Sequence, residues 1–428
     1  MKEYLKKLPA EIQDLINLIS KAASLRKWPV YLVGGFVRDL ILGKDNCDLD
    51  IVVEGEAEVF AADLAAKLGG RYVRHHQFGT ATVYKGHFKI DLATARREIY
   101  AQPASLPLVE FGTLQEDLKR RDFTINAMAI SICQNNFGEL KDFYQGRKDL
   151  KAKKIRVLHD LSFIDDPTRI LRSIRFEQRF GFKLEPHTLK LLKAARLKGM
   201  LEITQPQRLR EELILMFKEK QPLKQVKRLN QLAGLGFLNH KLKLTAKNKN
   251  LLKSVSQQIG WFNKVFPKRR KLDEWLIYLL AFLDCLDMNS TNEFCRKFVF
   301  RRGDEKRIFS AQNDIVNSAQ GLSKPKVAPA KIFKTLEPLS YEVIILAKAK
   351  YRNRHLQKYI ADFLEIYNGM RIYASGSDLR NLGLSPGPDY QKIFAEVLEA
   401  KLNGAVKTHE QEMELIKKMI RRDSHGQD

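Results

Sequence analysis

The chain has 428 residues, of which 44% are hydrophobic, and it carries a formal net charge of +25. This length exceeds what one ordinary core accommodates, so about two to four domains are expected. The sequence has no uninterrupted run of about 18 apolar residues, which argues against a transmembrane helix and a membrane partner.

The positive charge favours a polyanionic partner, and it is concentrated in one part of the chain. From Lys218 to Lys271 there are 15 Lys and Arg residues against a single acid, Glu219. This pattern indicates a face that binds RNA or DNA, and charge alone does not distinguish the two polymers. The alternative is a lysine-rich surface that is merely solvated.

The first 20 residues predict an amphipathic helix, because they lack the apolar core and the cleavage site of a signal peptide. The cysteines are scattered and form no Cys-x-x-Cys or Cys/His cluster, which argues against a zinc site or a disulfide framework. A reducing, cytoplasmic location is therefore expected. The four cysteines are Cys47, Cys133, Cys285 and Cys295.

Residues 28–150 have the pattern of an α/β region, in which residues 55–70 predict a helix that ends at glycine. After about Gly146 the strand patterns stop, and residues 150–428 are almost entirely helical in pattern. The chain is therefore expected to be α+β, with a small N-terminal sheet domain followed by a long helical array. The β-rich runs, each bounded by glycine or charged residues, are 29–35, 49–55, 71–93 and 123–132.

A strand pattern at 31–33 runs directly into Gly34 and Gly35, and a helical pattern follows. Paired glycines let backbone N–H groups approach a phosphate closely, and the following helix N-terminus favours an anion. Arg38 comes one turn later and can reach the same anion. The pattern is not that of a P-loop. The alternative is an ordinary tight turn.

Asp48 and Asp50 stand one residue apart where a buried strand is expected to begin, so both side chains point the same way. Two carboxylates about 7 Å apart repel each other, and a divalent cation would offset this. Oxygen ligands suit Mg²⁺, which can join carboxylates to nucleotide phosphates. Asp91, at the end of another strand pattern, is a third candidate ligand or a structural residue. The alternative for the pair is a solvent-facing strand end.

A third charged stretch runs from residue 116 to residue 130 and contains Arg120, Arg121, Asp122 and Asn126. Arginine can hold a triphosphate, and the Asp and Asn side chains can form hydrogen bonds with a ribose hydroxyl. The alternative is a charged helix surface with local ion pairs.

In residues 165–182, an aspartate before Pro167 is a good helix N-cap and Gly181 a plausible stop. An Asp and an Arg on one helical turn could offer an acceptor and a donor fork to the edge of a base. The alternatives are a simple cap and an i,i+3 or i,i+4 salt bridge. The residues concerned are Asp165, Asp166, Arg169, Arg172 and Arg175.

In this order and spacing, these stretches resemble the class II tRNA nucleotidyltransferases, the CCA-adding enzymes and their bacterial poly(A) polymerase relatives. The resemblance covers about residues 30–180, and residues 376–404 resemble a tail segment of the family. The motifs that carry it are "LVGGFVRDLILG…CDLDIVV", "ATARREIY", "LKRRDFTINAMAI", "DFYQGRKDL" and "DDPTRILRSIRF".

The resemblance implies a head of the DNA polymerase β type, residues 1–146, then a helical neck, 147–240, body, 241–370, and tail, 371–428. Asp48 and Asp50 would be catalytic and bind Mg²⁺, Asp166 and Arg169 would read the base edge, and "DFYQG" at 142–146 would act as a hinge. Asp165 replaces the glutamate usual in the family, at a position expected only to support the base-reading residues. The candidate nucleotide-binding residues are Gly34, Gly35, Arg38, Arg121, Asp122, Asn126, Asp166, Arg169, Arg172 and Arg175.

The expected reaction is attack of the tRNA 3′-OH on the α-phosphate of CTP or ATP, with release of pyrophosphate. Basic helices would hold the acceptor arm of the tRNA by its phosphates. Full CCA addition, CC addition alone and A addition alone remain open, and residues 96–112 occupy the place of a specificity-determining loop. Poly(A) addition and a non-catalytic RNA-binding role are further alternatives. The oligomeric state is left open.

Overall fold

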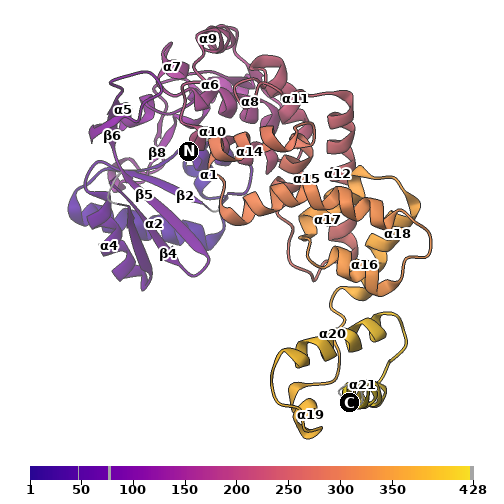
Figure 1. Ribbon diagram of the computed structural model, residues 1–428. Helices are drawn as coiled ribbons and strands as arrows, with labels where there is room; N and C mark the ends of the chain where they lie inside the picture. The colour runs from indigo at the N-terminus through magenta and orange to yellow at the C-terminus, as the bar shows by residue number, and fades with distance from the viewer. Residues whose placement is uncertain (47, 76–78, 425–428) are drawn as a thin grey trace. The chain divides into compact units, whose positions relative to one another are not determined.

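The computed structural model describes residues 1–46, 48–75 and 79–424, and Figure 1 shows its path. The chain divides into two compact units, residues 1–237 and residues 238–428. As expected, the fold is α+β, with the large sheet in the N-terminal part and helices in most of the remainder. The finer division into head, neck, body and tail stays a prediction.

Within the described residues, seven strands form the main sheet in the order β3-β4-β5-β2-β1-β8-β9. Of the neighbouring pairs, β2 and β5 run parallel and the others antiparallel. Every residue of β1 is buried, as its continuous apolar run predicts for a central strand. The strands are β1 Val30–Val33, β2 Leu49–Val53, β3 Arg71–His75, β4 Thr80–Lys85, β5 Phe88–Thr94, β8 Ala129–Ser131 and β9 Leu140–Lys141.

Helix α4, Ala57–Leu68, packs on β3, β4 and β5 and ends at Gly69, which adopts the left-handed conformation expected of a C-terminal glycine. Strands β6, Arg96–Ile99, and β7, Leu108–Phe111, form a separate hairpin. The other helical segments of this part are α3 Gly35–Ile41, α5 Leu114–Lys119, η2 Thr124–Asn126 and η3 Gln134–Asn136.

The single N-terminal helix predicted from the first 20 residues is wrong. The structure has two helices there, α1, Lys2–Leu5, and α2, Ala10–Arg26. Pro9 separates them, because proline lacks the N–H that continues a helix and disfavours a helical conformation at the residue before it.

The first unit continues with helices, and three of them, α9, α10 and α11, begin with proline at the first helical position. The expectation that strands stop after Gly146 is wrong in one detail. Strands β10, Lys154–Ile155, and β11, Lys183–Leu184, pair in parallel, and two residues are too few to show an alternating pattern. The helices are α6 Gly146–Lys151, α7 Ser162–Asp165, α8 Thr168–Phe180, α9 Pro186–Leu197, α10 Pro206–Phe217 and α11 Pro222–Leu232.

In its described residues, the second unit consists of helices and their connections. The apolar helix α13 packs against α12, α15 and α17. None of the described helices is both long and apolar enough to cross a membrane. The helical segments are α12 Ala246–Val265, α13 Glu274–Leu283, α14 Met288–Phe298, α15 Arg302–Leu322, α16 Pro329–Leu336, α17 Tyr341–Lys350, α18 Arg354–Asp362, η4 Phe363–Tyr367, α19 Gly376–Asn381, α20 Pro388–Leu402 and α21 His409–Ser424.

Candidate active site

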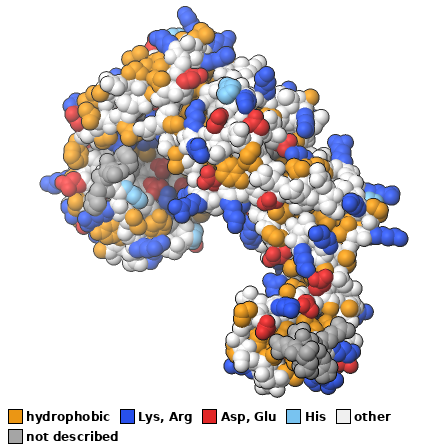
Figure 2. All heavy atoms as spheres, viewed as in Figure 1, with side chains coloured by type: hydrophobic (Ala, Val, Ile, Leu, Met, Phe, Trp, Pro, Cys, Tyr) orange, Lys and Arg blue, Asp and Glu red, His pale blue; other side chains and the backbone are white. Residues whose placement is uncertain are grey.

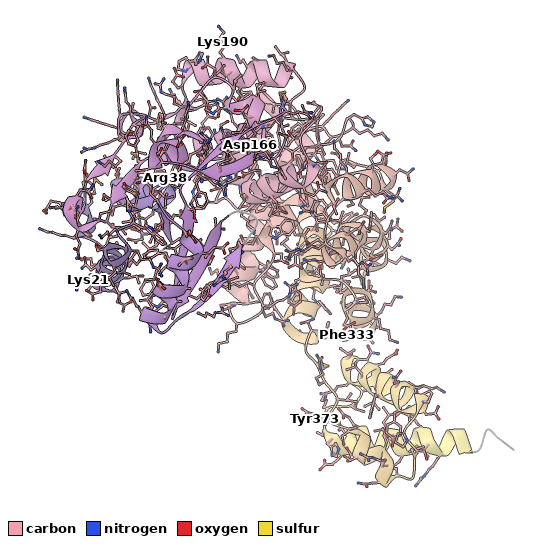
Figure 3. The ribbon with its side chains drawn as sticks, turned by 90° about the vertical axis from the view of Figure 1, so that its left-hand side faces the viewer. Lys21, Arg38, Asp166, Lys190, Phe333 and Tyr373 are labelled. Carbon is pink, nitrogen blue, oxygen red and sulfur yellow. The ribbon has the colours of Figure 1, made fainter. Side chains whose placement is uncertain are left out.

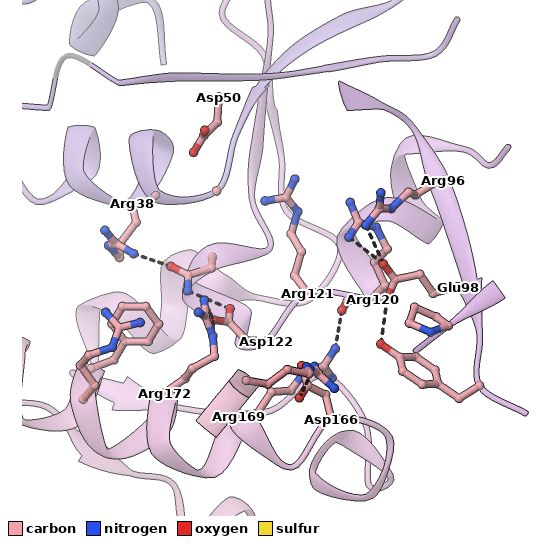
Figure 4. A pocket seen from close by; sticks show the side chains of 18 of the residues that line it. Arg38, Asp50, Arg96, Glu98, Arg120, Arg121, Asp122, Asp166, Arg169 and Arg172 are labelled. Atoms are coloured by element: carbon pink, nitrogen blue, oxygen red, sulfur yellow. Dashed lines mark hydrogen bonds and ion pairs between the residues drawn. The ribbon is translucent and has the colours of Figure 1, made fainter. Parts of the chain in front are cut away.

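A cavity of about 540 Å³ in the first unit gathers most of the residues singled out in the sequence (Figure 4). All ten candidate nucleotide-binding residues line it, and so does Asp50. Its lining holds nine arginines and four acidic side chains, so the cavity favours an anionic ligand. The arginines are Arg38, Arg96, Arg120, Arg121, Arg169, Arg172, Arg175, Arg179 and Arg208; the acids are Asp50, Glu98, Asp122 and Asp166.

Gly34 forms the turn between β1 and α3 with φ +67°, a conformation that favours glycine. A Cβ atom at this position would lie 2.7 Å from Nη1 of Arg121. A Cβ at Gly35 would meet no described atom closer than 3.5 Å. The turn therefore requires glycine at position 34, and that glycine lets the guanidinium of Arg121 lie against the backbone at one end of the cavity.

Arg38 is buried and held on three sides. Its Nη1 donates to Oδ1 of Asn126 at 2.6 Å, and its Nε and Nη2 donate to the carboxylate of Asp39 at 2.9 and 2.8 Å. Its guanidinium also lies 4.7 Å from the ring centre of Phe180 on α8. Arg38 therefore lines the cavity and at the same time joins the sheet domain to α8. Figure 3 labels Arg38 and Asp166 within the first unit.

Asp122 lies at the centre of a buried hydrogen-bond network. Its Oδ1 accepts from the backbone N–H of Phe123 and from Nδ2 of Asn126, both at 2.8 Å, and its Oδ2 accepts from Nε and Nη2 of Arg172. Burial would raise the pKa of this carboxyl, but Arg172 and Asn126 hold the pKa below its ordinary value. The four main acceptor positions of the carboxylate are filled, so a ribose hydroxyl would have to displace one of these donors.

Arg172 and Arg175 both reach Glu212 on α10. Arg172 donates from Nη1 to Oε1 at 2.8 Å, and Arg175 donates from Nε and Nη2 to Oε2 at 3.2 and 3.1 Å. The network therefore runs from α3 through Asn126 and Asp122 to α8 and α10, and it fixes the direction of two arginines that line the cavity.

Asp166 lies two residues before helix α8, and its side chain binds the first residue of that helix, Thr168. Its Oδ1 accepts from the backbone N–H of Thr168 at 3.1 Å and from Oγ1 of Thr168 at 2.5 Å, and it forms an ion pair with Nη2 of Arg208 at 2.8 Å. Its Oδ2 lies 3.9 Å from Nε of Arg169. Because two hydrogen bonds and an ion pair hold Oδ1, the orientation of the carboxylate is fixed while the residue still lines the cavity.

Arg169 is held from two directions beside Asp166. Its Nη1 donates to Oγ of Ser162 at 2.7 Å, and its Nη2 donates to the backbone carbonyl of Arg120 at 2.6 Å. The predicted Asp and Arg pair is thus rigid, with Arg169 on the first turn of α8 and Asp166 two residues before that helix.

The predicted metal site has three candidate carboxylates. Asp50 lies on β2, Asp91 lies on β5 and Asp48 precedes β2. Asp50 is half-buried and lines the cavity, whereas Asp48 is exposed and precedes β2. Burial raises the pKa of Asp50, and Asp91 and Asp48 raise it further against the opposing charge of Arg121. A raised pKa marks a carboxylate whose negative charge is poorly compensated, which a bound cation would correct.

Asp91 stands beside Asp50 in the parallel register of β2 and β5. Its Oδ1 accepts from Thr82 at 2.7 Å and its Oδ2 from Lys89 at 2.5 Å, so both oxygens have partners. Within the described residues no group of three or more His, Cys, Asp and Glu side chains could hold a metal ion. Two carboxylate residues fit Mg²⁺ as a partial set, because this ion usually keeps waters and takes substrate phosphates as further ligands.

The β6–β7 hairpin lines one side of the cavity, which the sequence pattern did not indicate. Glu98 on β6 accepts from Arg96 at 3.0 Å, from Arg120 at 3.1 Å and from the hydroxyl of Tyr100 at 2.9 Å. Burial and the charge of Glu98 raise the pKa of Tyr100. The segment 96–112 was recognised as a loop, and its alternation of charged and apolar residues was the available signal for a hairpin.

Arg208 and Glu212 on α10 were also missed. They lie in the ordinary amphipathic sequence "PQRLREEL", and nothing local to that sequence ties them to Asp166, Arg172 or Arg175.

Comparison with known proteins places the chain in one family. The family model described as Poly A polymerase head domain matches residues 30–156. An A-adding tRNA nucleotidyltransferase of Geobacter sulfurreducens is 37% identical over 414 residues, which is 95% of this chain and 47% of that protein. The chain therefore spans about half the length of this relative.

Two further relatives match along nearly their whole length. An A-adding tRNA nucleotidyltransferase of Halalkalibacterium halodurans is 29% identical over 95% of this chain and 92% of its own length. A solved structure of the Thermotoga maritima CCA-adding enzyme complexed with tRNA is 35% identical, covers 98% of both chains and superposes with a TM-score of 0.72. The chain belongs to the tRNA nucleotidyltransferase family, which includes the A-adding and CCA-adding enzymes.

Proposed function

We propose that this protein is a template-independent nucleotidyltransferase that adds C, A or both to the 3′ end of tRNA. The observation that carries the proposal is one arginine-rich cavity that is lined by Asp50 of the sheet and by the Asp166–Arg169 pair of α8. A nucleoside triphosphate needs cationic groups for its phosphates and a rigid donor and acceptor for its base, and both are present.

In the proposed reaction, the 3′-oxygen of tRNA forms a bond to the α-phosphorus of the nucleotide. The bond from that phosphorus to the bridging oxygen breaks, and pyrophosphate leaves. Asp48 and Asp50 would hold Mg²⁺, which when bound supplies charge that polarises the attacking hydroxyl and stabilises the leaving group. Arg121 and Arg175 line the cavity and would neutralise phosphate charge.

Base selection is proposed to rest on Asp166 and Arg169. Cytosine and adenine each present an exocyclic amino group beside a ring nitrogen acceptor, so a carboxylate can accept from the first and an arginine can donate to the second. Uracil and guanine carry a carbonyl oxygen where the amino group would be, which would leave the carboxylate facing another acceptor. Discrimination follows because an unpaired buried polar group is costly.

A specialised A-adding enzyme is the second candidate. It is favoured by the names of the Geobacter sulfurreducens and Halalkalibacterium halodurans relatives, both A-adding enzymes. Addition of CC alone and poly(A) addition remain alternatives within the family. The proposed location is the cytoplasm, where the 3′ ends of tRNAs that carry no amino acid are repaired.

The exposed lysines of the second unit and of α11 are proposed to hold the tRNA by its phosphates, independently of sequence. Lys224, Lys247 and Lys253 are exposed, and Figure 2 shows further Lys and Arg side chains on the visible face of the second unit. The tRNA-bound Thermotoga maritima relative supports this partner.

The test supplies three tRNAs, ending before CCA, after C and after CC, each with CTP, ATP or both. A CCA-adding enzyme extends all three, and an A-adding enzyme extends only the tRNA that ends in CC, and only with ATP. Extension of the first two primers as far as CC, with no extension of the tRNA that already ends in CC, would leave CC addition. Long homopolymer products would favour poly(A) addition. If no nucleotide is incorporated on any primer, the non-catalytic RNA-binding role would be favoured instead.

A further inference from the structure

The β6–β7 hairpin exposes an unusual amount of apolar surface. Five large hydrophobic side chains with substantial exposure lie between residues 99 and 111, and the most exposed is Phe111 at 75%. Loops with binding roles often carry such side chains, because an exposed apolar patch marks a contact surface. The five residues are Ile99, Leu106, Leu108, Val109 and Phe111.

The pairing of the two strands assigns these residues to two faces. Glu98 pairs with Val109 and Arg96 pairs with Phe111, and directly paired residues lie on the same face of a sheet. Glu98, Val109 and Arg96 line the cavity, so Phe111 lies on the cavity face of the hairpin. The opposite face carries Arg97, Ile99, Leu108 and Glu110.

The direction of β7 places Phe111 toward the catalytic sheet. After Phe111, the N–H of Gly112 donates to the carbonyl of Ala95, whose own N–H donates to the carbonyl of Val53 on β2. Val53 is three residues from Asp50 along the strand, which corresponds to ~10 Å. The loop end of the hairpin lies at the other side, where the N–H of Ala104 donates to the carbonyl of Ile164, two residues before Asp166.

The incoming base and Phe111 are therefore at different ends of the hairpin. Tyr100, Leu106 and Pro107 line the cavity at the loop end, beside Asp166, where the base of the incoming nucleotide is proposed to bind. The described residues that line the cavity include Val109 but not Phe111, which continues the same face beyond Val109 toward the hydrogen bonds that join the hairpin to β2.

We propose that Phe111 is the stacking platform for the 3′-terminal base of the tRNA. The inference rests on the proposed function, because the terminal ribose must bring its hydroxyl to the Asp50 side of the nucleotide. Single-stranded RNA ends offer unstacked bases that bind to aromatic side chains without regard to sequence. The arginine-rich cavity next to this face complements the adjoining phosphates, and Arg97 on the other face is already paired with Glu110 at 2.5 Å.

The test compares hairpin variants of the full chain in tRNA extension. Phe111→Ala should raise the KM for tRNA by ~5- to 150-fold, the range of one lost base stack, and should leave the KM for ATP and CTP unchanged. Phe111→Trp should remain near wild type, and Phe111→Leu should resemble Phe111→Ala. Leu108→Ala is the matched control, because it removes an exposed apolar side chain from the opposite face of the same hairpin.

A second readout reports stacking directly. A tRNA that carries 2-aminopurine as its last base should lose fluorescence on binding to the wild-type protein and to Phe111→Trp, and much less on binding to Phe111→Ala. Equal quenching in wild type and Phe111→Ala, or wild-type behaviour of Phe111→Leu, would overturn the proposal. A rise in the KM for the nucleotide with an unchanged KM for tRNA would assign Phe111 to the incoming base instead. If wild-type protein extends no tRNA at all, the proposed function fails, which is a separate result.

Discussion

Arg172 of helix α8 donates through Nη2 to Oδ2 of Asp122 at 2.7 Å, and this contact joins the helix to the segment that follows α5. The same guanidinium reaches Glu212 on α10, so one arginine connects three parts of the first unit. The helix that carries the proposed base-reading pair is thereby held at a fixed place relative to the sheet that carries Asp50.

The Asp122–Arg172 contact is expected to matter for both stability and catalysis. Arg172→Gln should lower the free energy of unfolding by ~3–5 kcal/mol, because it leaves the buried carboxylate of Asp122 without its cationic partner. Asp122→Asn should cost less, because Arg172 is partly exposed and keeps its ion pair with Glu212. The double variant should lose less than the sum, with a coupling energy of ~1–3 kcal/mol.

A double-mutant cycle measures this coupling, in denaturant unfolding and in kcat/KM for the nucleotide. Arg179→Gln combined with Asp122→Asn is the matched control, because Arg179 lies on the same helix and lines the same cavity. Additivity of the Asp122 and Arg172 effects within ~0.5 kcal/mol would contradict the coupling.

Gly34→Ala is expected to impair nucleotide binding. Its Cβ would approach Nη1 of Arg121, and alanine would have to adopt a positive-φ backbone conformation that is nearly restricted to glycine and costs ~1–3 kcal/mol. The KM for ATP and CTP should therefore rise as Arg121 is displaced, and unfolding should occur at lower denaturant. Gly35→Ala is the control for stability, and an unfolding midpoint equally lowered by both substitutions would refute the special requirement at Gly34.

The second unit contains a carboxylate, that of Glu342, whose negative charge should stabilise the fold of this unit. Glu342 accepts from Nη1 and Nη2 of Arg270 at 2.8 Å each and from the N–H of Asp273 at 3.0 Å. Burial would raise the pKa of Glu342, but these donors lower it from 4.5 to about 2. Because the pKa of Glu342 is lower in the folded than in the unfolded protein, its contribution to stability is fully present at pH values above the unfolded-state pKa. This contribution is lost as the pH falls toward 2.

Glu342→Gln should therefore cost ~2–3 kcal/mol of unfolding free energy near pH 7 and progressively less as the pH falls below 4.5. The measurement is urea unfolding of wild type and variant between pH 7 and pH 3. A difference between the two that stays constant across this range would show that the charge of Glu342 does not stabilise the fold.

Binding of tRNA is expected to weaken steeply with salt. If the basic helices contact about six phosphates, affinity should fall ~10³-fold between 50 and 200 mM salt. Lys247→Glu combined with Lys253→Glu should reduce the slope of log K against log salt by ~2, whereas Lys21→Glu on α2 should leave it unchanged. A flat salt response in wild type, or equal slopes for both sets of variants, would remove the basic helices from the tRNA interface.

Much of the site could be predicted because its signals are local in sequence. The turn at Gly34 and the helix from Thr168 to Gly181 each depend on residues within one short stretch, and the structure places them as expected. Glu212 and Glu98 were not predicted, because their partners lie on other elements and only the fold brings them together. Buried polar contacts between distant segments leave no periodic pattern for the sequence to reveal.

The structure also changes the expectation for Asp91. The sequence offered it as a third metal ligand or a structural residue, and Thr82 and Lys89 now occupy both of its oxygens. Asp91 lies in the middle of β5 and not at the end of a strand, as the sequence had indicated. Which neighbours a strand carboxylate meets depends on strand order and register, and in this sheet β4 is the neighbour that supplies Thr82.

The most direct test of the proposed chemistry is nucleotide incorporation by Asp50→Asn and Asp48→Asn beside wild type, with tRNA binding measured on the same preparations. Each variant keeps the shape of the side chain and removes the charge that would hold Mg²⁺. Incorporation of CTP or ATP at saturating Mg²⁺ should fall by ~10³-fold or more, and the affinity for tRNA should stay within about twofold of wild type. Incorporation at the wild-type rate by either variant would contradict the assignment of this carboxylate pair as the catalytic metal site.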